Sequence, residues 1–186
     1  MITIRQALPE DLKRVEYICR MTAGPLSQSD EYAGNVTAKV YSTYYIREEY
    51  KTCFLLDDDG EAVGYVLCAP DCRRFAKIYR SVDAPAIMKL EKRSGYLAYA
   101  IPLLYLFFGS KYPAHLHIDI LEGYRGGGNG SRLIETLLNK LKADKVKGVM
   151  LAVDTENTKA VHFYEKNGFH KVFSLASCTV MAQKLL

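Results

Sequence analysis

The feature that most constrains this chain is an apolar segment that runs into a glycine-rich turn and then directly into an amphipathic helix. Residues 115–121 have the composition of a strand, glycine occupies four of the five positions 126–130, and an apolar stripe runs through 131–143. Glycine lets the backbone adopt left-handed conformations and lets a ligand come close to it. The free N–H groups and the positive dipole end of the following helix favour an anion. The segment therefore predicts a pyrophosphate site, with Arg125 adding a positive charge at its rim.

Two familiar phosphate-binding motifs do not fit this segment. A P-loop ends in Gly-Lys-Ser/Thr, whereas Gly130 and Ser131 are followed by Arg132 and no lysine. The dinucleotide-binding pattern G-x-G-x-x-G is not present with its spacing intact, and the strand comes late, after an expected antiparallel hairpin. The plain alternative is a glycine-rich turn without a ligand, in which four glycines would cost conformational entropy for no gain.

The rest of the pattern predicts one α/β domain over residues 1–186, with a mixed α+β sheet and helices on both faces. The region 23–35 is expected to be a loop, and 70–113 to be an irregular, partly helical insertion. Strands are expected at 2–7, 52–56, 62–69, 115–121, 148–153, 169–175 and 178–184, and helices from Pro9 and over 36–50, 131–143 and 158–167.

Composition bears on location and partners. The net charge of +4 is too small to demand a nucleic acid or a membrane as partner. Five scattered cysteines predict a reducing, cytoplasmic location, and no metal is expected because Cys68 and Cys72 lack a second ligand pair. No signal peptide opens the chain, and the apolar run 97–108 is too short to cross a bilayer. We expect that run to be buried or, alternatively, to join a homodimer interface.

Two motifs carry a resemblance to a known family. Arg125, Gly128 and Gly130 form the pattern Arg-x-x-Gly-x-Gly, and residues 157–169 read N-T-K-A-V-H-F-Y-E-K-N-G-F, which is similar to N-x-x-A-x-x-F-Y-x-x-x-G-F. In these motifs and in the order of its elements, the chain resembles the GNAT acetyltransferases, most specifically over 115–175. The resemblance implies the GNAT acyl-CoA N-acyltransferase fold, with the helical insertion between the third and fourth strands.

The resemblance also implies acetyl-CoA as cosubstrate and direct transfer of its acetyl group to a primary amine of a small molecule or peptide. The glycine turn would hold the pyrophosphate, and the strand before it would bind the acetyl carbonyl and the pantetheine arm. Tyr164 would protonate the departing thiolate. The implied cofactor-binding residues are Ile118, Ile120, Arg125, Gly126, Gly127, Gly128, Asn129, Gly130, Ser131, Asn157, Ala160, Phe163 and Tyr164.

A base that takes the proton of the amine is expected on the same strand. Asp119, His117 and His115 share one face, opposite the isoleucines, unless a bulge reverses that parity. Glu122 just beyond the strand and a water relay are further candidates. The alternative for the two histidines is simple packing against a helix, and for Tyr164 a place in the core.

Departures from the family pattern keep a second function open. Gly127 stands where lysine or arginine is common, and Asn129 where an aliphatic residue is common. Together with the lack of an assured base, they leave the alternative of a non-catalytic acyl-CoA-binding or protein-interaction module.

A narrower resemblance involves residues 112–121, which read Y-P-A-H-L-H-I-D-I-L. This segment, the end of the hairpin at 69–71 and the long insertion are similar to the acetyltransferase-like domain of O-GlcNAc hydrolases. The insertion is expected to act as a lid over the acceptor. Its lysines, arginines and tyrosines point to an acceptor with a carboxylate or a sugar-like face, or else to a solvated helix face with aromatic residues in the core.

Overall fold

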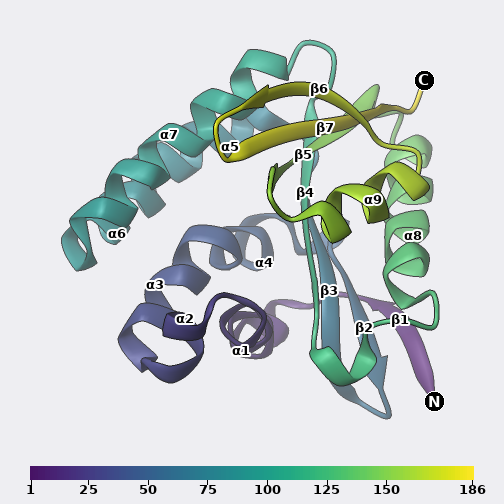
Figure 1. The fold of residues 1–186 in the computed structure, drawn as a ribbon, viewed down its shortest axis with the longest axis horizontal. Helices are drawn as coiled ribbons and strands as arrows, with labels where there is room; N and C mark the ends of the chain where they lie inside the picture. The colour runs from purple at the N-terminus through teal and green to yellow at the C-terminus, as the bar shows by residue number, and fades with distance from the viewer.

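A seven-stranded sheet runs through the computed structural model, which describes residues 1–186 (Figure 1). The strands lie in the order β1-β2-β3-β4-β5-β7-β6, and all neighbours are antiparallel except β4 and β5, which are parallel. The strands are β1 (Ile2–Gln6), β2 (Phe54–Asp58), β3 (Glu61–Ala69), β4 (Ala114–Ile120), β5 (Gly148–Asp154), β6 (His170–Leu175) and β7 (Cys178–Lys184).

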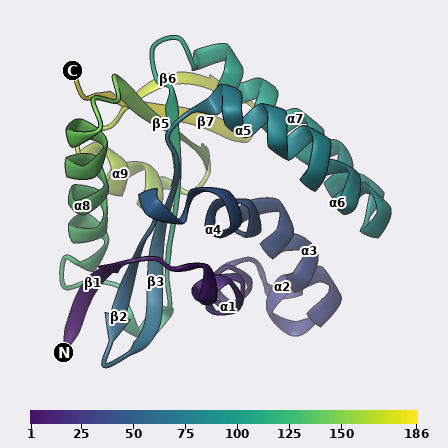
Figure 2. The same ribbon diagram turned by 180° about the vertical axis from the view of Figure 1, so that it is seen from behind.

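Helices cover both faces of this sheet, as Figures 1 and 2 show. Helices α8 and α9 lie on one face and α1 to α7 on the other, so the predicted mixed fold and the helical insertion between the third and fourth strands are confirmed. The helices are α1 (Leu12–Thr22), α2 (Pro25–Ser29), α3 (Glu31–Tyr41), α4 (Thr43–Glu49), α5 (Cys72–Ile78), α6 (Ala84–Leu90), α7 (Lys92–Phe108), α8 (Asn129–Ala143) and α9 (Thr158–Lys166), with short turns η1 (Pro9–Asp11), η2 (Tyr50–Thr52), η3 (Tyr79–Asp83) and η4 (Glu122–Tyr124).

The sheet opens between its two parallel strands. Strand β4 pairs with β5 only at Ala114–Val149 and His115–Met150, and β5 offers no partner to the rest of β4. On its other edge, β4 stays paired with β3 as far as Ile120. The two central strands therefore diverge, and the opening between them connects the two faces of the sheet.

The predicted loop at 23–35 and the predicted continuous helix at 36–50 are both wrong. Pro25 takes the first position of α2, and the side chain of Asp30 caps α3 by accepting the N–H of Ala33 at 2.7 Å. The expected helix breaks at Ser42, whose hydroxyl donates to the carbonyl of Ala38 at 2.9 Å. Turn-forming residues here begin and end short helices, proline through its fixed φ and Asp30 and Ser42 through side-chain bonds to the backbone.

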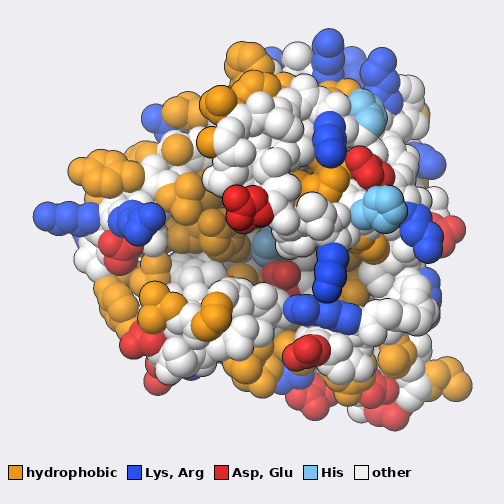
Figure 3. Space-filling view, viewed as in Figure 1, with side chains coloured by type: hydrophobic (Ala, Val, Ile, Leu, Met, Phe, Trp, Pro, Cys, Tyr) orange, Lys and Arg blue, Asp and Glu red, His pale blue; other side chains and the backbone are white.

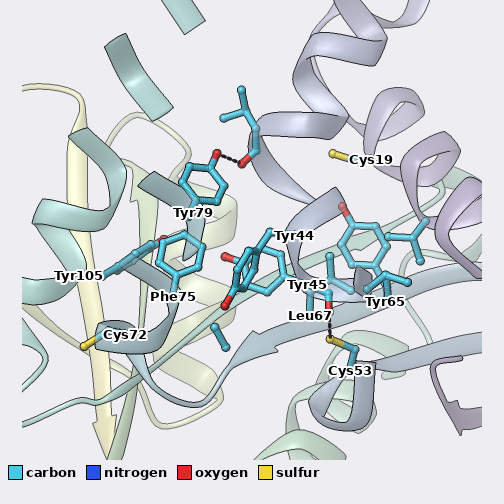
Figure 4. Packing of buried hydrophobic residues seen from close by; sticks show 14 of the residues in the cluster. Cys19, Tyr44, Tyr45, Cys53, Tyr65, Leu67, Cys72, Phe75, Tyr79 and Tyr105 are labelled. Atoms are coloured by element: carbon cyan, nitrogen blue, oxygen red, sulfur yellow. Dashed lines mark hydrogen bonds between the residues drawn. The ribbon is translucent and has the colours of Figure 1, made fainter. Parts of the chain in front are cut away.

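The insertion is packed into the core by an aromatic cluster (Figure 4). The ring of Phe75 lies 4.8 Å from those of both Tyr44 and Tyr79, and 6.1 Å from that of Tyr105. The hydroxyl of Tyr79 donates to the carbonyl of Val40 at 2.7 Å. Helix α5 and the turn η3 are therefore a fixed layer on α3 and α4, which gives the site a rigid wall on this side.

The apolar run 97–108 lies in α7. Tyr105 in this run is buried, whereas Leu103 and Phe107 are exposed, so self-association through the run stays a prediction. Measured by length and apolarity together, none of the helices is suited to crossing a membrane.

An ion pair also ties the insertion to α4. The guanidinium of Arg47 donates two hydrogen bonds of 2.8 Å to Asp83, a carboxylate that is only 6 % exposed. Because this carboxylate has lost most of its water, the paired geometry compensates for its burial.

We expect Arg47→Ala to lower the free energy of unfolding by about 3 kcal/mol, because it leaves the buried carboxylate of Asp83 unpaired. Urea unfolding followed by circular dichroism measures this. The double variant Arg47→Met with Asp83→Leu removes both charges and should recover most of the loss. A single variant as stable as the wild type would contradict this account of the pair.

Candidate functional site

The glycine turn has the geometry of an anion cradle. Gly126, Gly127 and Gly128 have φ angles of 91°, 58° and 82°, and no other atom lies within 4 Å of the position that a side-chain Cβ would take at any of them. Helix α8 begins without a side-chain cap, and the N–H groups of 126–128, 130 and 131 donate to no acceptor in the chain. Open space above free donors at a helix N-terminus fits a phosphate group.

A groove of about 730 Å³ runs from this turn to the opening between β4 and β5. It contains most of the cofactor-binding residues that the sequence predicts, but neither Gly127 nor Asn129. The predicted residues that line it are Ile118, Ile120, Arg125, Gly126, Gly128, Gly130, Ser131, Asn157, Ala160, Phe163 and Tyr164.

Two of the predicted side chains hold the groove in shape. Asn129 is nearly buried and donates to the carbonyl of Tyr124 at 3.0 Å, which closes the loop below the glycines. Asn157 begins α9, and its Oδ1 accepts the N–H of Ala160 at 3.1 Å. The amide N–H₂ of Asn157 has no partner in the chain, so it is available to a ligand in the groove.

Positive charge reaches the groove from residues that the sequence analysis missed. Lys159 and Lys166 of α9 both line it. They lie seven residues apart, so they share a helical face near Phe163, and this spacing was a signal visible in the sequence. They supply positive charge to a site where Gly127 replaces the lysine or arginine that is common at that position. The residues present therefore fit the pyrophosphate of a coenzyme A thioester.

Three side chains meet at the inner end of the groove. The Oδ2 atom of Asp119 accepts the hydroxyl of Tyr65 at 2.6 Å and lies 2.9 Å from Nε2 of His117, while Oδ1 has no partner in the chain. Burial opposes a charge on His117, but the adjacent carboxylate outweighs it and, with a hydrogen bond from the ring to the sulfur of Cys19, raises the pKa of His117 to about 10. At neutral pH His117 is therefore an imidazolium paired with Asp119, and it cannot itself accept a proton.

The phenol of Tyr164 lies in the same groove and is nearly buried. Burial raises its pKa well above the ordinary value for tyrosine, and the negative charge of Asp119 adds to that shift. Tyr164 therefore keeps its proton at neutral pH, which suits a donor and excludes a base.

Two other candidate bases lie outside the groove. His115 is fully buried, its ring stacks on Tyr105 at 3.9 Å, and neither ring nitrogen has a hydrogen-bond partner. Burial lowers the pKa of His115 to about 3, so it is a neutral packing residue. Glu122 lies exposed in η4 and does not line the groove.

The side chains of His117 and Asp119 lie on one face of β4, as strand alternation predicts. Strands β3 and β4 pair without a register shift, so no bulge reverses this arrangement.

One group of possible metal-ligating atoms comes together in the structure, and it does not include Cys68 or Cys72. Cys68 and Cys72 are buried, free thiols, whereas Cys19, His117 and Asp119 bring three donor atoms within 4.8 Å of one another. The His117–Asp119 ion pair already accounts for two of them.

Comparison with known proteins places the chain in a family. Residues 23–169 match the acetyltransferase (GNAT) family model. The chain shares 30% identity with the solved structure of SsHAT, at a TM-score of 0.89 and coverage of 100% of this chain and 98% of that one. The PaiA N-acetyltransferase of Thermoplasma acidophilum, solved with coenzyme A, is similar at 17% identity, a TM-score of 0.65 and 99% coverage of both chains.

A Drosophila melanogaster polyamine N-acetyltransferase matches at 12% identity and a TM-score of 0.67 over all of both chains. The chain belongs to the GNAT acetyltransferase family and is an acetyltransferase. The narrower resemblance to the domain found with O-GlcNAc hydrolases stays a prediction.

We expect the ring resonances of His117 to titrate near pH 10, and to titrate below 6.5 in Asp119→Asn, because burial then acts without the opposing carboxylate. Nuclear magnetic resonance of the histidine rings measures both values. The raised pKa stabilises the folded state below pH 6.5, and this contribution is lost as the pH rises through 10. A wild-type midpoint near 6.5 would show that the pair is not formed in solution.

Proposed function

We propose that this protein is an acetyl-CoA-dependent N-acetyltransferase that moves an acetyl group directly to the primary amine of a small-molecule or peptide acceptor. The observation that carries the proposal is the continuity of the site. Free N–H groups at the glycine turn, the groove beside α9 and the cluster at Asp119 follow one another toward the opening between β4 and β5. The unpaired edge of β4 beyond His115 suits the pantetheine arm, which carries its own amide groups.

In this proposal the residues divide the chemistry between them. The free Oδ1 of Asp119 accepts a hydrogen bond from the amine and takes its proton, directly or through a water. His117 and Tyr65 are positioning residues that hold Asp119 through its other oxygen. The amine nitrogen bonds to the acetyl carbon, the carbon–sulfur bond breaks, and Tyr164 donates a proton to the leaving sulfur. A thiolate with a pKa near about 8.5 needs only this mild assistance.

The predicted cytoplasmic location belongs to the same proposal. All five cysteines are unpaired and four are buried, as expected for a chain that folds in a reducing compartment.

We expect acetyl-CoA to bind with a micromolar dissociation constant and Gly128→Asp to weaken binding at least tenfold, because a carboxylate there repels the phosphates. Arg125→Glu should weaken it for the same electrostatic reason. Isothermal titration calorimetry measures both. The matched control is Gly60→Asp in the β2–β3 turn, where φ is 96° and the space is equally open.

Gly60→Asp imposes the same backbone strain far from the groove and should bind acetyl-CoA normally. Failure of the wild type to bind at millimolar acetyl-CoA would overturn the proposal. Binding without turnover of any amine would instead support the non-catalytic module.

We expect Tyr164→Phe to lower kcat roughly 100-fold while leaving the dissociation constant of acetyl-CoA almost unchanged, because it removes only a proton donor. Thiol release in an amine-dependent assay measures kcat. Since no catalytic metal is proposed, EDTA should leave the wild-type rate unchanged. A rate in Tyr164→Phe equal to that of the wild type would exclude Tyr164 as the acid.

A further inference from the structure

A second cavity meets the groove at the opening in the sheet. It has a volume of about 390 Å³ and shares His117 and residues 152–154 with the groove. Figure 3 shows a hollow coated with hydrophobic side chains between α7 and α3, with a histidine and an acidic side chain at its inner end. A molecule in this cavity therefore reaches the same point as a thioester in the groove, but from the opposite side.

The walls of this cavity are mainly apolar. Helix α7 contributes Leu97, Ile101 and Leu104, which repeat at helical spacing and face Tyr41 of α3 and Phe75 of α5 across the space. These residues come from three helices that the aromatic cluster holds together, so the walls are preformed. A cavity of this size lies at the small end of the range of about 300–1,000 Å³ that is usual for small-molecule sites.

Charge is scarce in the cavity and lies where the cavity meets the groove. Asp154 lines both the cavity and the groove and is exposed, and its Oδ1 already accepts the N–H of Glu156 at 3.0 Å. Asp119 lines the groove and not the cavity; it lies beside His117, where the two spaces meet, and one of its oxygens has no partner in the chain. The cavity thus offers an apolar surface for the body of a molecule, and anionic contacts lie only where it meets the groove.

The expected basic lid does not line this cavity. Arg73, Lys77 and Arg80 surround a different surface hollow beside Leu106, and Arg74 forms ion pairs with Glu48 and Glu49. The basic side chains named here therefore do not support the expectation of a carboxylate-bearing or sugar-like acceptor, because they do not line the cavity. These basic residues lie on the solvent-facing sides of amphipathic helices.

We propose that the acceptor is a primary amine on a single aromatic or aliphatic body, whose ammonium group meets Asp119 and whose body fills the cavity beside α7. This inference rests on the proposed function. A polyamine or a lysine-rich peptide would bring further charges against apolar walls that offer them no partner, and such burial is unfavourable. A phenyl ring or a short alkyl chain gains instead from leaving water.

The test is a thiol-release assay with acetyl-CoA and four acceptors: 2-phenylethylamine, hexylamine, spermidine and a lysine-rich peptide. We expect kcat/KM for the first two to exceed that for the last two at least tenfold. Preference for spermidine or the peptide would overturn the inference while leaving N-acetyl transfer intact. Failure of acetyl-CoA to bind would instead overturn the proposed function.

Paired variants on α7 locate the acceptor. Leu97→Gln changes a cavity wall, whereas Leu103→Gln makes the same change on the same helix outside the cavity, and both residues are about half exposed. We expect KM for 2-phenylethylamine to rise at least fivefold in Leu97→Gln and to stay unchanged in Leu103→Gln, with acetyl-CoA binding equal in both. Equal effects of the two variants would contradict the placement.

A variant that fills the cavity tests how large an acceptor the cavity admits. It also distinguishes a cavity that binds the acceptor from one that binds a long acyl chain. Ile101→Trp should abolish acetylation of 2-phenylethylamine while sparing ethylamine. If the wild type preferred hexanoyl-CoA to acetyl-CoA, and Ile101→Trp removed that preference, the cavity would belong to the acyl chain and the inference would fail. If no amine were acetylated, saturation-transfer difference nuclear magnetic resonance would measure whether 2-phenylethylamine binds to the protein–CoA complex. Absence of binding would overturn the inference.

Discussion

The site depends on the early end of pairing between β4 and β5. Only the first two residues of β4 have partners on β5, while its other edge stays paired with β3 to the end of the strand. A sheet interior normally leaves no room for a ligand, because each backbone group is paired with the adjacent strand. Here the divergence frees one edge of β4 and opens a passage between the two faces. The groove and the second cavity share residues from both strands at this passage.

The protonation state of the site follows from the register of the neighbouring hairpin. Tyr65 of β3 lies directly opposite Asp119 of β4, so the phenol meets the carboxylate as a cross-strand pair. His117, two residues earlier, reaches the same oxygen from the same face. A register shift of one residue would send Asp119 to the other face of the sheet. The charge on His117 and the free oxygen of Asp119 are thus consequences of strand pairing as much as of residue type.

Local patterns in the sequence predict the parts of the site that local structure makes. The glycine turn follows from a strand, a run of glycines and an apolar helical stripe, and α9 lies within the helix expected over 158–167. Strand alternation also predicts that His117 and Asp119 share a face. The contact of Tyr65 with Asp119 joins residues 54 positions apart. The sequences of β4 and β5 likewise do not indicate where the pairing between these strands ends. Such features depend on tertiary packing, which no short window of sequence contains.

The insertion shows why composition alone does not place its basic residues relative to the cavity. Its helices carry many lysines and arginines, but an amphipathic helix turns such residues to water and its apolar stripe inward. The stripe through Leu97, Ile101 and Leu104 would ordinarily be core, and on sequence alone the two cases are identical. What distinguishes them is the opposite wall, since α3 and α5 stand back far enough to leave a cavity of about 390 Å³. An apolar stripe that faces a preformed cavity, next to a groove that holds the carboxylate of Asp119, favours a ligand that covers the stripe, because exposure of the stripe to water is otherwise unfavourable.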